Sequence, residues 1–72
     1  MTYSIDLKVY EPASMYEVPF PVPEAMRDTN GHLKVGYHNM NLACQEDRFE
    51  NLLEWGNRNG SILKIIGWQR LG

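Results

Sequence analysis

The stretch Gln45–Leu71, QEDRFENLLEWGNRNGSILKIIGWQRL, decides the fold. Its first half places Phe49, Leu52 and Leu53 at the i, i+3, i+4 spacing of a helix with one buried face. The positions on the opposite side are all polar: Glu46, Asp47, Glu50, Asn51, Glu54 and Arg58. We therefore expect one amphipathic helix over Gln45–Arg58.

The second half of this stretch predicts a strand that begins soon after the helix ends. Asn59 and Gly60 tolerate the positive φ that a helix C-terminus needs. Ile62–Ile66 is then rich in β-branched residues and too short for a helix, which favours a central strand with the helix packed across it. Gly67 interrupts this run, as a bulge or as a site of close backbone approach.

Two further strands are predicted from residue alternation. Tyr3–Tyr10 alternates apolar and polar residues over its whole length, so it should have one buried face. His32–Met40 follows a turn at Asp28–Gly31 and alternates in the same way, so it is the second predicted strand, which could extend as far as Ala43. Four aromatic side chains share faces with apolar residues and are expected in the core: Tyr3, Phe20, Tyr37 and Phe49.

A proline-rich segment between these strands allows two structures. Pro19, Pro21 and Pro23 fall on alternate residues, so an extended chain would lose its N–H donors along one edge only. Val18–Val22 is then either an edge strand that pairs on one side, or an extended loop.

These elements predict an α+β fold: a small antiparallel sheet of three to four strands, with one helix packed on one face. Residues 1–72 form a single domain, and we expect a self-contained product. The apolar content of 43% fits a globular protein, and no apolar run is long enough to span a membrane. Cys44 is the only cysteine, which favours a reducing compartment, the cytoplasm.

The net charge of −2 is concentrated in the helix. Gln45–Arg58 has two more acids than bases, whereas the acids and bases of the remaining chain balance. The four carboxylates, together with two aromatic side chains as apolar anchors, are our candidate partner-binding residues: Glu46, Asp47, Glu50, Glu54, Trp55 and Tyr10. The alternative is a solvated helix face that keeps a small protein soluble.

The sequence offers little for catalysis. His32, His38 and Cys44 are the soft metal-ligand candidates, but intervals of six residues fit no zinc motif. A Cys44–His38 nucleophilic pair lacks an identifiable orienting group. Phosphate-loop and dinucleotide-binding signatures are absent. We therefore expect no catalytic residues, no metal and no cofactor, and without a basic patch we expect no direct nucleic-acid binding.

In size and layout the chain resembles small phage-encoded inhibitors of host machinery, such as anti-CRISPR proteins and phage inhibitors of bacterial RNA polymerase. The resemblance rests on the strand Tyr3–Tyr10, the acidic helix Gln45–Arg58 and the closing strand Ile62–Arg70. It implies a non-enzymatic protein that binds and blocks a larger protein with a basic surface. Such a protein would act away from membranes, as a monomer or weak homodimer. The alternative is a small structural or assembly subunit, and a nucleic-acid binder or an enzyme is less favoured.

Overall fold

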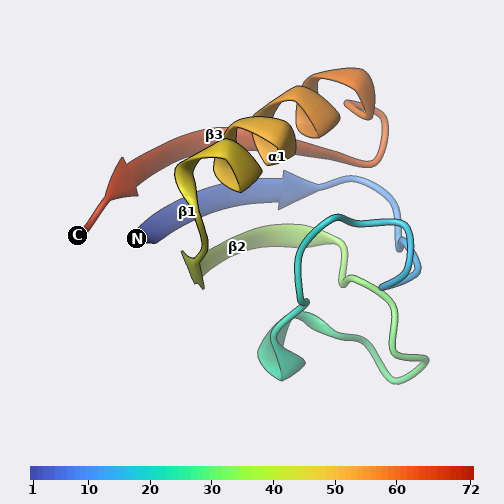
Figure 1. Ribbon diagram of the computed structural model, residues 1–72. Coiled ribbons are helices and arrows are strands. Elements are labelled where there is room, and N and C mark those ends of the chain that lie inside the picture. Colours follow the sequence, from blue (N-terminus) through green and yellow to red (C-terminus); the bar gives the residue numbers. More distant parts are fainter.

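The computed structural model describes residues 1–72 (Figure 1). The regular elements follow in the order β1 (Thr2–Val9), the 3-10 turn η1 (Glu24–Met26), β2 (Gly36–Ala43), α1 (Glu46–Arg58) and β3 (Leu63–Arg70). The predicted first strand and the helix agree with β1 and α1 to within one residue at each end. No helix is both long and apolar enough to cross a membrane.

The sheet has three antiparallel strands in the order β2-β1-β3, and α1 packs on one of its faces. This confirms the predicted α+β fold. Because β2 and β3 both run antiparallel to β1, they are parallel to each other, and α1 is the crossover that connects them. The chain ends lie side by side in Figure 1. There, the Thr2 N–H donates to the Gly72 carbonyl and the Leu71 N–H donates to the Thr2 carbonyl, both at 2.8 Å.

The central strand is β1, so the prediction of a central closing strand was wrong. Strand β3 lies at an edge. Its β-branched run is explained by a bulge: Leu7 lies opposite Ile65 and Asp6 lies opposite Gly67, which leaves Ile66 as an extra residue. The bulge lets Ile65 pack against the core while Ile66 remains half exposed.

The core lies between one face of the sheet and a layer made of α1 and the region that connects β1 to β2, and its fourteen buried apolar residues form one cluster. Helix α1 contributes Phe49 and Leu52 to this cluster and also buries Gly56, and Phe49 stacks on Tyr3 with ring centroids 3.9 Å apart. A Cβ atom at position 56 would lie 3.4 Å from Ile65 Cδ1, so glycine allows the helix to approach β3 closely.

The proline-rich segment is a loop that bends at Val18–Phe20, so it is not extended over its whole length, and the edge-strand alternative was wrong. Val18, Phe20 and Val22 do share a buried face, as the alternation predicts. None of the three uses its N–H in a backbone hydrogen bond of a loop or turn, and none belongs to a strand. Their burial is therefore due to side-chain packing alone. The loop crosses the sheet beside α1, on the same face, over β2 (Figure 1).

The Asp28–Gly31 turn is confirmed by a hydrogen bond of 3.0 Å from the Gly31 N–H to the Asp28 carbonyl. The following strand, however, begins at Gly36 and not at His32. The alternation that buries Leu33 is already broken at Val35, which is 52% exposed, and Tyr37 lies opposite Lys8 on the uncovered face of the sheet, where it is 69% exposed. The prediction of Tyr37 in the core was therefore wrong.

Strand β2 presents a continuous open edge. The Cys44 N–H donates to the Met1 carbonyl at 2.9 Å, and hydrogen-bonded residues alternate from there along an antiparallel pair. The amides of the even-numbered residues of β2 from His38 to Leu42 therefore face β1, while those of four exposed residues face away from it: Tyr37, Asn39, Asn41 and Ala43.

Candidate functional site

The four predicted carboxylates are all exposed on α1, and we refer to Glu46, Asp47, Glu50 and Glu54 as the acidic row. Two of them stand in the first turn of the helix, where negative charge is favoured by the helix dipole. The Asp47 Oδ1 atom also accepts a hydrogen bond of 3.0 Å from the Arg48 N–H. The row is therefore compatible with a stable helix.

Part of the acidic row, Glu46 and Glu50, lies on the flank of α1 that faces β3, whereas Asp47 and Glu54 lie on the side of the helix opposite its buried face. At about 100° per residue, Leu53 lies next to Glu50 and Glu46 on the helix surface. Leu53 also lines a shallow depression of about 240 Å³ together with Ile65 and Trp68 of β3. These three residues form the Trp68 patch, so part of the row borders a partly exposed apolar surface.

The charges of the row are largely free of partners. Its one ion pair joins Glu54 to Arg58 at 3.8 Å, and both side chains are about two-thirds exposed. A surface pair of this kind contributes less than about 1 kcal/mol, and a competing partner can displace it. Glu46, Asp47 and Glu50 form no ion pair.

Trp68 is held in place although it is half exposed. Its indole makes edge-to-face contacts with Phe49 and Tyr3, with centroids 4.8 Å and 6.1 Å away. Both contact residues are buried in the core. The exposed indole is therefore pre-organised, which lowers the entropy lost when a partner covers it.

Neither of the two predicted aromatic anchors, Trp55 and Tyr10, lies next to all four carboxylates of the acidic row. Trp55 is about 100° from Glu54 around the helix, with Arg58 between them, and it packs half-buried against the core. Tyr10 is 45% exposed and lines a separate depression at the C-terminal end of α1, with Asn57 and Lys64. Reasoning from sequence missed Trp68 as the neighbouring aromatic, because its position depends on the bulge in β3 and on how α1 lies across that strand.

The negative charge of the acidic row affects the pKa of a buried side chain, the Tyr3 hydroxyl. Burial raises the pKa of Tyr3 above its ordinary value, and the negative charge of Glu46 raises it further. Glu50 acts in the same direction more weakly, while the positive charge of Arg70 lowers this pKa. The two carboxylates therefore lie close enough to Tyr3 to raise the pKa of its hydroxyl.

The candidate ligand residues for a metal are separated. His38 Nε2 lies 2.7 Å from the Lys34 carbonyl oxygen, and His32 is exposed in the preceding loop. Six residues of extended chain place Cys44 about 20 Å from His38, so the two cannot act as a nucleophilic pair. No three residues among His, Cys, Asp and Glu are grouped to hold a metal ion.

Comparison with known proteins adds no identity: no protein-family model, no curated protein and no solved structure matches this chain.

Proposed function

We propose that this chain is a non-enzymatic protein-binding module, of the inhibitor type, that docks on a basic surface of a larger protein. The observation that carries this proposal is the position of the acidic row beside the half-exposed, packed Trp68. Carboxylates of this kind accelerate encounter with a basic partner, and a rigid aromatic side chain supplies contact energy at the interface centre. The single thiol, Cys44, favours a cytoplasmic setting.

The structure changes which anchor we propose. Trp55 already packs against the core on the other flank of α1, and Tyr10 lines a neighbouring depression at the last turn of the helix. Trp68 shares a depression with Leu53, and Leu53 lies next to Glu46 and Glu50 on the surface of α1. We therefore assign the apolar contact to the Trp68 patch, and the steering charge to Glu46, Asp47, Glu50 and Glu54.

Charge reversal tests this proposal. The parent chain captures its partner from a bacterial lysate, and association rates are then measured at low and high salt. We expect Glu50→Lys with Glu54→Lys to slow association several-fold and to flatten its salt dependence, because attraction becomes repulsion. Both side chains are exposed, so the free energy of unfolding should change by less than about 1 kcal/mol.

The matched control reverses two exposed carboxylates elsewhere, Glu11→Lys with Glu17→Lys. It makes the same change in net charge, so it should retain the association rate if the row is the contact surface. Equal association rates for the two double variants and the parent would show that the acidic row is only a solvated face. Trp68→Ala should raise the dissociation rate, because it removes the apolar anchor.

A small assembly subunit is the second candidate, and the open edge of β2 favours it. This edge is eight residues long and has no proline, no bulge and no Asp, Glu, Lys or Arg side chain. Such an edge is a template for pairing with another strand. The molar mass in solution separates the two candidates, because a stable homo-oligomer at micromolar concentration would favour assembly over inhibition.

A further inference from the structure

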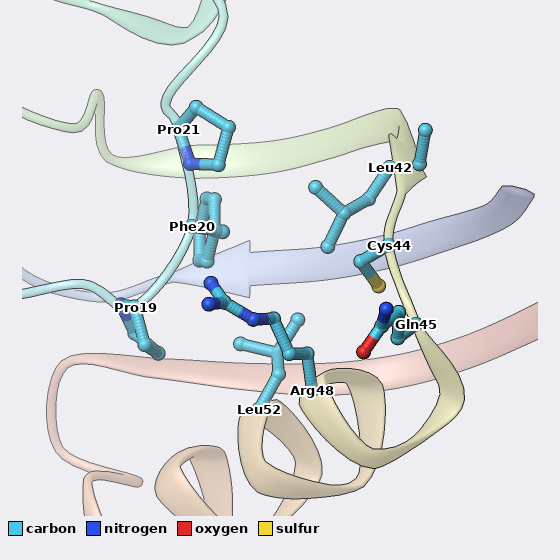
Figure 2. Close-up of a pocket in the computed structure, with 9 residues that line it drawn as sticks. Pro19, Phe20, Pro21, Leu42, Cys44, Gln45, Arg48 and Leu52 are labelled. Carbon is cyan, nitrogen blue, oxygen red and sulfur yellow. The ribbon is translucent and has the colours of Figure 1, made fainter. Parts of the chain in front are cut away.

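A cleft of about 370 Å³ lies on the flank of α1 opposite the Trp68 patch. It is formed where the proline-rich loop passes the junction between β2 and α1, and Figure 2 shows its lining side chains converging from these segments. Its volume falls in the range of small-ligand sites, roughly 300–1,000 Å³. Nothing in the proposed docking surface uses it.

Apolar and polar groups contribute about equally to the walls of the cleft. Phe20 and Leu52 are buried side chains at its base, and Leu42 is half-buried at the end of β2. Pro19 and Pro21 flank Phe20 on the loop side and carry no N–H donors. An apolar group entering here would be covered by side chains from both the loop and the helix.

Arg48 is the only charged residue that lines the cleft. Figure 2 shows its side chain reaching from α1 toward Pro19 and Phe20 of the loop. Its guanidinium forms no ion pair, because the one pair in the chain joins Glu54 and Arg58. Gln45 stands beside Arg48 in the lining and makes no side-chain capping hydrogen bond, so its amide is free as a second donor.

The nearest carboxylates in sequence do not neutralise this site. Glu46 is about 160° from Arg48 around the helix axis, and Asp47 is about 100° away. Neither lines the cleft. The cleft therefore combines apolar side chains with an unpaired cation and no anion.

We propose that this cleft binds a carboxylate that has an apolar body. The apolar part lies against Phe20, Leu42 and Leu52, and the carboxylate accepts hydrogen bonds from the Arg48 guanidinium and the Gln45 amide. A guanidinium matches the two oxygens of a carboxylate in a bidentate pair. The same chemistry is offered by a free monocarboxylic acid and by the C-terminus of a peptide ending in an apolar residue.

NMR titration of the whole chain tests this site, with sodium hexanoate and N-acetyl-Ala-Leu as probes. We expect saturable shifts of the Leu42, Cys44 and Leu52 amides. Arg48→Gln should weaken binding roughly three- to tenfold, since it removes a partly solvated ionic hydrogen bond. Hexanamide has the same chain length as hexanoate but no charge. The parent chain should therefore bind hexanamide roughly three- to tenfold more weakly than it binds hexanoate.

The matched control is Arg58→Gln, which removes the same charge from the same helix outside the cleft. It should bind both probes as the parent does. Tighter binding of hexanoate identifies a free acid as the ligand, and tighter binding of the dipeptide identifies a peptide C-terminus. The proposal is overturned if neither probe gives saturable shifts at the cleft, or if both arginine variants weaken binding equally.

Discussion

Leu52 joins α1 to the sheet and also forms the base of the cleft, and its side chain is only 2% exposed. Leu52→Ala should lower the free energy of unfolding by roughly 2–5 kcal/mol, because it leaves a cavity in the core. A chain of 72 residues has a total stability of roughly 4–11 kcal/mol, so this variant will be close to unfolding. Urea denaturation measures the difference.

The control is Asn51→Ala, one position earlier and exposed. It should change the stability by less than about 0.5 kcal/mol. A denaturation midpoint unaffected by Leu52→Ala would mean that this face of α1 does not pack on the sheet.

Tyr3 gives the stability a dependence on alkaline pH. Its pKa is raised in the folded chain by burial and by Glu46, so the folded state holds the hydroxyl proton more tightly than the unfolded state does. The stabilisation is fully present below the ordinary pKa of 10.0 and is lost as the pH rises through the higher folded value. The parent should therefore lose more stability between neutral pH and about pH 11 than Tyr3→Phe does. Identical losses in the two proteins, measured by urea denaturation at both pH values, would contradict this.

At this scale the sequence predicts most of the core. Tyr3, Phe20 and Phe49 are buried as expected, since their neighbours two or three to four residues away are also apolar. The prediction for Tyr37 was wrong because the alternation that buries Leu33 does not continue into β2: Val35 is already exposed, and the core face of β2 is formed by its even-numbered residues. Trp68 was not recognised as the aromatic beside the acidic row, because its contacts come from other elements.

Among the elements, the open edge of β2 can be tested one amide at a time. Because their N–H groups face away from β1, the amides of Tyr37, Asn39 and Asn41 should exchange with solvent much faster than those of His38 and Met40. Hydrogen exchange followed by NMR measures each amide. Protection of all five amides at low concentration would mean that the edge of β2 is already covered.

The same experiment should find fast exchange at Val18, Phe20 and Val22, because the proline-rich loop forms no ladder. The three side chains are buried together, although the backbone bends at Val18–Phe20 and does not stay extended as the alternation assumed. Whether the backbone also pairs depends on how close the loop lies to a strand edge. The sequence also did not predict the order of the strands in the sheet. Strands β1 and β3 both have apolar faces, and only their packing decides which of them is central.

At the scale of the whole molecule, α1 separates two surfaces of opposite chemistry. One flank carries part of the acidic row beside Trp68, and the other borders the cleft with Arg48. The sequence predicted the acidic row, because charge spacing on a helix can be read directly, but not the position of Trp68 beside it. It did not predict the cleft, because Phe20, Leu42 and Arg48 come together only when the loop folds over the sheet.

The paired chain ends have one consequence for engineering. Because Thr2 is hydrogen-bonded to Leu71 and Gly72, a short glycine linker would join residue 72 to residue 1 without bending β1 or β3. The resulting ring would have fewer conformations when unfolded, which stabilises the native state by up to roughly 4 kcal/mol. Opening that ring in the exposed Asn30–Gly31 turn would give a circular permutant whose ends lie far from both surfaces of α1.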